Sequence, residues 1–223
     1  RREPMNTSLR AVRNRPSSYH LIAPLTRYVM AETQRQLGFF PADSRFQIGI
    51  NVAPSHLRQG ELLKDLNLFW YSANPVQQLV IEITERDALQ DVDYRMVREL
   101  HRKGAKIAID DFGTGNSSLS WLERLRPDVL KIDKSFTMAI GTDAVNSTVT
   151  DMIIALGQRL NIELVAEGVE NPRQAQHLRQ QGVHILQGFL YARPMPIKEF
   201  PRWLAGWASP PARHRGLMMP LMP

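Results

Sequence analysis

The sequence has no cysteine among its 223 residues, which excludes disulfides and metal sites built on thiolates. It also has no uninterrupted apolar run near the ~18 residues that a membrane-spanning helix needs, and no signal peptide is visible. None of its six histidines lies at the end of a strand-like run or shows metal-ligand spacing. These absences leave a folded domain whose chemistry uses side chains with oxygen and amine groups. The lack of cysteine also fits a protein of a reducing compartment.

The middle of the chain, residues 16–209, also lacks a net positive charge. The formal net charge is +6, from 28 Lys and Arg against 22 Asp and Glu. Residues 1–15 contain five arginines and one glutamate, a net of +4, and residues 210–223 contain two arginines, a net of +2. Subtracting both ends leaves no net charge for residues 16–209, so we expect no binding of duplex nucleic acid.

Six apolar, strand-like runs alternate with helical patterns along the chain. The runs are FQIGINV (46–52), QLVIEIT (78–84), KIAID (106–110), VLKID (129–133), IELVAEGV (162–169) and HILQGF (184–189). This alternation predicts an α/β fold with parallel strands and helical crossovers. On this pattern alone, an open doubly wound sheet and a closed eightfold barrel both remain possible.

The polar residues at the strand ends favour the barrel. In chain order they are Asn51, Glu82, Asp110 with Asp111, Lys131 with Asp133, Glu167, and Gln187. A TIM-like barrel opens all its strand ends on one face, where its chemistry lies, whereas an open sheet would gather ligands at one switch point. Since only six strands are visible, we expect one strand to lie before residue 1 and one weak strand to be hidden in the chain.

These strand-end side chains favour a site for hard divalent cations. Four carboxylates in one barrel mouth would repel one another unless cations lay between them. Their oxygen donors suit Mg²⁺ or Mn²⁺ rather than zinc, and two ions about 3.5–4 Å apart suit hydrolysis of a phosphodiester. Lys131 could orient the attacking water or stabilise the transition state electrostatically.

Six short motifs occur in a fixed order along the chain. They are EITE (82–85), IDDFGTGNSS (109–118), KID (131–133), AEGVE (166–170), QGF (187–189) and ARPMP (192–196). With NVAPSHL (51–57), they resemble the EAL-domain family of cyclic-di-GMP phosphodiesterases over roughly residues 20–200. The resemblance implies a TIM-like (βα)8 barrel modified by one antiparallel strand. It is strongest to the branch whose domain follows a periplasmic sensor and membrane helices.

The resemblance also implies roles for individual residues. Two ions, Mg²⁺ or Mn²⁺, would be held by Asn51, Glu82, Asp110, Asp111 and Glu167, with Asp110 bridging them. The catalytic residues would be Asp110, Asp111, Lys131, which acts on the water bound by the metal, and Glu85, which holds the loop 111–117. The substrate, cyclic di-GMP, would contact Gln187, Asp133 and Arg193, and the product would be the linear dinucleotide pGpG.

The chain departs from the family at its beginning, because the tripeptide that names the family is absent. We expect its glutamate, the first metal ligand, a few residues before Arg1, so that residues 1–209 form a domain with an incomplete first unit. Residues 210–223 are expected to be a disordered tail. The resemblance further implies a homodimer that forms near residues 134–146. It also implies a cytoplasmic domain. In this branch of the family, the domain would belong to an inner-membrane protein with an upstream sensor or membrane segment.

Other interpretations stay open at this point. Taken singly, Asp110 and Asp111 could cap a loop, Lys131 and Asp133 could form a structural ion pair, and Gln187 could be a hydrogen-bonded core residue. A non-catalytic receptor for the same nucleotide, with an incomplete metal site, is the main alternative function. A different barrel metalloenzyme, with Lys131 as the base that abstracts a proton, is the other.

Overall fold

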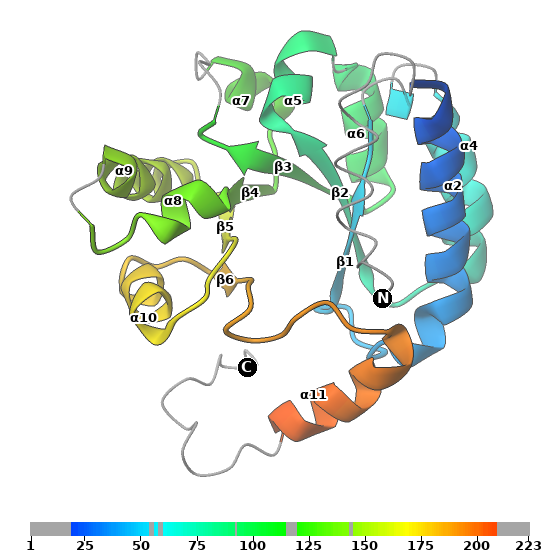
Figure 1. Cartoon of the computed structure of the whole chain (residues 1–223). Coiled ribbons are helices and arrows are strands. Elements are labelled where there is room, and N and C mark those ends of the chain that lie inside the picture. The colour runs from blue at the N-terminus through cyan, green and yellow to red at the C-terminus, as the bar shows by residue number, and fades with distance from the viewer. Residues whose placement is uncertain are drawn as a thin grey trace.

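Six parallel strands form one sheet in the order of the sequence, as the computed structural model shows (Figure 1). It describes residues 19–208 except 54–55, 58–59, 92, 115–119 and 143–144. The strands are β1 (Gln47–Asn51), β2 (Gln78–Thr84), β3 (Lys106–Phe112), β4 (Val129–Ile132), β5 (Glu163–Ala166) and β6 (Ile185–Leu186). Every neighbouring pair is parallel, so the polypeptide must cross over between strands each time.

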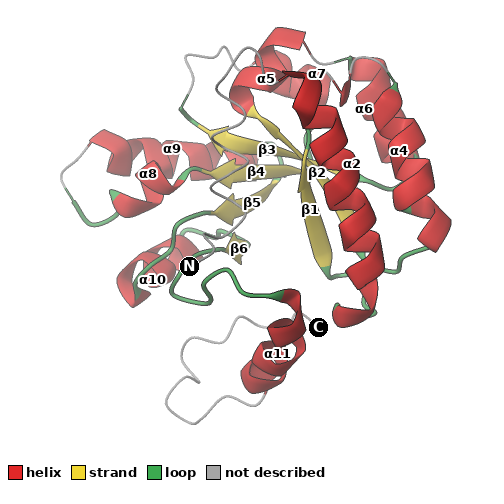
Figure 2. Cartoon of the chain, turned by 45° about the vertical axis from the view of Figure 1, so that its right-hand side comes forward, coloured by secondary structure: helices red, strands yellow, loops and turns green. Residues whose placement is uncertain are grey.

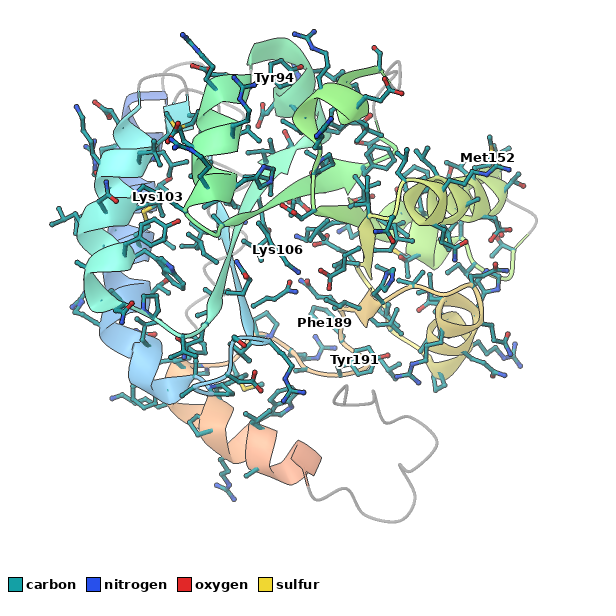
Figure 3. The ribbon with its side chains drawn as sticks, turned by 180° about the vertical axis from the view of Figure 1, so that it is seen from behind. Tyr94, Lys103, Lys106, Met152, Phe189 and Tyr191 are labelled. Carbon is teal, nitrogen blue, oxygen red and sulfur yellow. The ribbon has the colours of Figure 1, made fainter. Side chains whose placement is uncertain are left out.

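The sheet is strongly curled (Figure 2). In a flat sheet β1 and β5, four strands apart, would be separated by roughly 19 Å, at about 4.8 Å per strand. Instead, the amide of Gln47 on β1 lies 3.4 Å from the carboxylate of Glu163 on β5. Lys106 of β3, which is labelled in Figure 3, also reaches Glu163, at 2.8 Å. The curl therefore encloses an interior, as in a barrel.

The helices lie on the outside of the curl (Figure 1), and those between consecutive strands supply the crossovers. They are α2 (Tyr19–Gln36), α4 (Glu61–Phe69), α5 (Glu85–Asp91), α6 (Tyr94–Arg102), α7 (Ser120–Leu125), α8 (Lys134–Met138), α9 (Val145–Arg159), α10 (Pro172–Gln180) and α11 (Phe200–Ala208), with 3-10 turns at Leu37–Phe39, Tyr71–Ala73 and Ile197–Glu199. Local sequence signals mark several ends. Asn171 begins α10 with a complete capping box, and Gly104, with φ +82°, follows α6.

Two separate apolar clusters correspond to the two faces of the sheet. The larger lies between the strands and the helices, and includes Ile81, Ile109 and Leu130. The smaller consists of Val80, Ala108, Val129 and Val165, with Ile185 packed against it. Because side chains alternate along a strand, this smaller cluster occupies the inner face of the curl. An interior filled by side chains from successive strands is typical of a barrel and excludes the doubly wound alternative.

The structure confirms all six predicted strands and the barrel class, with the barrel incomplete over the described residues. Among them there is neither the antiparallel strand implied by the resemblance nor the weak strand that we expected. The short helices α5 and α8 were not foreseen. The expected tail at 210–223 lies outside the described residues. No helix in the described part of the chain is long and apolar enough to cross a membrane.

Candidate active site

The predicted strand-end residues lie at one end of the curled sheet. Asn51 closes β1 and is paired in register with Glu82 of β2. Asp110 and Asp111 lie near the end of β3, and Lys131 lies in β4. The remaining two follow directly after β5 and β6: they are Glu167 and Gln187. Parallel strands bring these positions to the same edge, as the sequence pattern predicts.

Lys131 lies at the centre of this group. Its ammonium Nζ is 2.9 Å from Glu82 Oε2, 3.0 Å from Asp110 Oδ1 and 2.7 Å from Glu167 Oε1. Burial opposes the charged ammonium, yet the attraction of the three carboxylates outweighs it and raises the pKa of Lys131 above its usual range. Lys131 is therefore a fixed positive charge that joins β2, β3 and the end of β5.

The pKa of Glu167 also departs from its ordinary value. Burial raises this pKa, and the negative charges of Asp110 and Glu82 raise it further, while the nearby ammonium of Lys131 only partly offsets them. Three carboxylates contact the single ammonium of Lys131, so one lysine does not neutralise them. The group retains an excess of negative charge that favours a further cation.

The adjacent pair Asp110 and Asp111 reaches the same space through an unusual backbone conformation. In a regular strand two consecutive side chains point to opposite faces. Here Asp111 has φ +55°, and the pairing of β3 with β4 shifts register between Ile109 and Phe112. As a result, one oxygen each from Asp110, Asp111 and Glu167 lie within 4.8 Å of one another, the spacing that ligands of one ion require.

Glu85 contacts the loop that follows this pair. Its carboxylate Oε2 accepts a hydrogen bond from the backbone N–H of Gly113 at 2.9 Å, and Glu85 is itself buried. Gly113 has φ +95°, and a Cβ there would lie 2.6 Å from Ile153 and 2.9 Å from Phe136. The loop start thus depends on a glycine with a positive φ and on a buried acceptor, while residues 115–117 lie outside the described residues.

Gly49 is part of the site, although the sequence analysis did not single it out. It lies on the inner face of β1, two residues before Asn51. A Cβ at this position would lie 2.2 Å from Glu82 Oε1, so the absence of a side chain gives the Glu82 carboxylate its place. A glycine inside a strand is a known sign of such a close approach, and that signal could have identified it.

The three candidate substrate residues are arranged differently from one another. Asp133 is buried and caps α8 by accepting a hydrogen bond from the N–H of Ser135, so its carboxylate has a structural contact. Gln187 is exposed beyond β6. Arg193 is exposed as well, and its guanidinium lies 4.4 Å from the centre of the Phe189 ring. Phe189 and Tyr191 are labelled beside β6 in Figure 3.

The donor set fits a hard divalent cation. It consists of the carboxylates of Glu82, Asp110, Asp111 and Glu167, with the amide of Asn51 beside them. No described histidine joins the group: the buried His56, for example, pairs with Asp65 of α4 at 2.7 Å, and Arg27 of α2 binds the same carboxylate. An all-oxygen set that already surrounds an ammonium with three carboxylates is suited to Mg²⁺ or Mn²⁺ chemistry and not to zinc.

One family model matches most of the chain. The family model for the EAL domain matches residues 8–194. The probable cyclic di-GMP phosphodiesterase PdeD of Escherichia coli K12 is 74% identical over 205 residues, which are 92% of this chain and 38% of that relative. The chain thus spans well under half the length of this relative.

Two solved structures are similar to the chain in fold. The PaMucR phosphodiesterase in complex with c-di-GMP has a TM-score of 0.74 and 34% identity, covering 82% of this chain and 76% of that one. Klebsiella pneumoniae BlrP1, in a manganese and cyclic di-GMP complex, has a TM-score of 0.65 and 29% identity, covering 82% of this chain and 47% of that one. Metal and nucleotide thus occur together on this fold.

Proposed function

This chain belongs to the EAL domain family, and from this premise we propose that it is a metal-dependent phosphodiesterase that hydrolyses cyclic di-GMP to linear pGpG. The observation that carries the proposal is the group of carboxylates around Lys131 at the strand ends. Four carboxylates carry more negative charge than one lysine can neutralise. Such a set is costly in a fold unless it binds cations.

Asn51, Glu82, Asp110, Asp111 and Glu167 would hold two ions, Mg²⁺ or Mn²⁺, with Asp110 shared between them. When bound, these ions would lower the pKa of a water and stabilise the charge that develops on the phosphate oxygens. The fit of the donors and the manganese complex of a structural relative support this assignment.

The chain's own residues have distinct tasks in this reaction. Lys131, held on three sides, would orient the attacking water and place a positive charge beside the phosphate in the transition state. Glu85 would keep Gly113 and the start of the loop in the working conformation. Glu85 acts by pre-organisation, because its hydrogen bond with Gly113 exists before substrate arrives.

Substrate binding would involve residues near β6. Gln187 and Arg193 are exposed there, so their amide and guanidinium groups are available to a guanine base or a phosphate. Asp133 already caps α8. It would therefore fix the end of the strand beside Lys131, and it would contact the substrate from this position. Stacking of Arg193 on Phe189 keeps its guanidinium plane oriented.

We also propose that the chain acts as a homodimer and as the cytoplasmic part of a longer, inner-membrane protein with an upstream sensor. The length of the PdeD relative, of which the chain spans 38%, leaves room for such segments.

The test is an assay of this chain with cyclic di-GMP and either Mg²⁺ or Mn²⁺, with the products separated by chromatography. A version extended upstream of Arg1 is assayed beside it, because we expect the family's leading glutamate there. We expect pGpG, abolished by Glu82→Ala and by Lys131→Ala. Glu163→Gln, a change to an inner-face carboxylate at the other end of the strands, should leave turnover within about twofold of the parent.

The same assay separates the hydrolase from a receptor. Tight binding of cyclic di-GMP without turnover in both lengths of the chain would refute the enzyme and leave a nucleotide receptor. Failure to bind the nucleotide at all would favour a different barrel metalloenzyme.

A further inference from the structure

The ammonium of Lys131 occupies a position that a metal ion would be expected to take. Lys131 is 6% exposed, and its Nζ lies 2.9 Å from Glu82 Oε2 and 3.0 Å from Asp110 Oδ1. Those two carboxylates belong to the set that would hold the proposed ions. The lysine is thus the counter-ion of the ligand set itself.

We propose that Lys131 and a divalent cation compete for Glu82 and Asp110, so that metal loading requires the ammonium to withdraw from these carboxylates. The inference rests on the proposed metal-dependent function and goes beyond it, since it gives Lys131 a role before any substrate binds. A cation within about 2.1–2.5 Å of oxygens on both carboxylates would lie close to Nζ. Two positive charges at that separation repel strongly in a partly buried site.

The same contacts explain why the ligands are in place beforehand. Glu82 lies in β2, Asp110 lies in β3, and Glu167 follows directly after β5. Their mutual repulsion would drive them apart without a positive charge between them. Lys131 holds them within reach of one point. Lys131 therefore has two opposing effects. It pre-organises the metal site, and it lowers the affinity of that site for a divalent cation.

Replacing the charge should consequently move two quantities in opposite directions. Lys131→Met keeps the length and apolar stem of the side chain but removes the ammonium. The metal-free protein should become less stable, because three partly buried carboxylates lose their partner. Its affinity for Mn²⁺ should rise by about tenfold or more, because the competing charge is gone. A lysine with a purely structural role would instead lower both stability and affinity.

Lys106 offers a matched control on the same inner face (Figure 3). It also pairs with a carboxylate, Glu163, at 2.8 Å, but at the beginning of its strand rather than near the end. Lys106→Met removes the same charge from the same interior, and we expect Mn²⁺ affinity to stay within about twofold of the parent. Lys131→Arg, which keeps the charge, should show no gain in affinity.

The experiment is a calorimetric titration of Mn²⁺ into the metal-free chain and the three variants, with thermal unfolding measured on the same samples. A Lys131→Met variant that unfolds as one cooperative unit but binds Mn²⁺ no more tightly than the parent would overturn the competition. Absence of Mn²⁺ binding by the parent and by Lys131→Met alike would count against the proposed function itself.

A second measurement keeps the test decisive if Lys131→Met does not fold. The parent chain, labelled with ¹⁵N in its lysine side chains, is titrated with Mg²⁺ while the Nζ signal of Lys131 is followed, assigned by its loss in Lys131→Arg. Competition predicts that this signal shifts as the ion binds while that of Lys106 does not. Binding of Mg²⁺ with an unchanged Lys131 signal would overturn the proposal.

Discussion

At the scale of single residues, the site depends as much on a missing side chain as on the charged ones. Gly49 leaves open the volume that the Glu82 carboxylate fills, 2.2 Å from where a Cβ would lie. In Gly49→Ala, the carboxylate must swing away, since it is the flexible end of its side chain. We expect Mn²⁺ affinity and turnover to fall by about 10–100-fold, as when the support of a metal ligand is removed.

The free energy of unfolding should change little in Gly49→Ala, by about 1 kcal/mol or less, because alanine lowers the entropy of the unfolded chain. Titration of Mn²⁺, turnover and urea unfolding measure the three quantities. Gly38→Ala is the matched control, since no atom lies within 4 Å of a Cβ there. Full Mn²⁺ affinity in Gly49→Ala would show that Glu82 does not need this space.

The residue scale also shows where sequence reasoning stops. The sequence identified Asp110 and Asp111 as a candidate pair, but adjacency alone predicts opposite faces of a strand. The φ of +55° at Asp111 and the register shift beside β4 come from tertiary packing. Likewise, no spacing along the chain indicates that Lys131 reaches Glu82, 49 positions away. Only the curl of the sheet brings them together.

At the scale of elements, the apolar runs predicted all six strands of the described residues, whereas two short helices were not predicted. The two unforeseen helices, α5 and α8, have seven and five residues, too few for a helical period to be recognised. Both begin directly at polar strand ends, at Glu85 and after Asp133. A strand end with a carboxylate can therefore be both the end of one element and the cap of the next.

Helix α6 permits a prediction about pH at this scale. Its N-cap Asp93 accepts a hydrogen bond from the N–H of Arg95 at 2.9 Å. This bond, and the Arg95 side chain after it, hold the pKa of Asp93 below its ordinary value. A lowered pKa means that the charged cap stabilises the fold above about pH 3.9, the ordinary aspartate value. The contribution is lost as the pH falls through the lower pKa of the folded state.

Asp93→Asn should retain the cap, because asparagine also caps well, but lose this pH dependence. The free energy of unfolding of the parent should exceed that of the variant near pH 7, and the difference should shrink from pH 4 downwards. High salt should reduce it at pH 7, since the pair with Arg95 is exposed. Urea titrations at a series of pH values measure it. A difference that stays constant into acid would contradict the prediction.

At the scale of the whole molecule, the interior of the curl is layered. Gln47, Lys106 and Glu163 form a polar layer at the strand beginnings, the small apolar cluster follows, and the carboxylates with Lys131 lie at the far end. An ion pair without net charge and a group with an excess of negative charge are thus separated by apolar side chains within one interior. This separation allows the site end to concentrate negative charge without disturbing the ion pair that joins β3 to β5.

The outer surface has its own marked feature, the face formed by α8 and α9. Three large apolar side chains are exposed there, Met138 (57%), Val145 (78%) and Met152 (66%), and Met152 is labelled on α9 in Figure 3. Apolar side chains that lie together on a solvent-exposed face often mark an interface with another protein. Two of the three lie in the range 134–146 in which we expect the homodimer to form. Since α8 directly follows the strand of Lys131, such an interface would adjoin the site.

Met152→Glu should therefore shift the chain from dimer to monomer. A charge placed in an apolar interface must be desolvated without a partner, so the dimer dissociation constant should rise by about 100-fold or more, or about 3 kcal/mol. Light scattering after size-exclusion chromatography, at several protein concentrations, measures the mass. Val76→Glu, at an exposed apolar residue remote from α8 and α9, should leave the mass unchanged. A parent chain that is monomeric at every concentration, or a Met152→Glu variant that stays dimeric, would exclude this face as the interface.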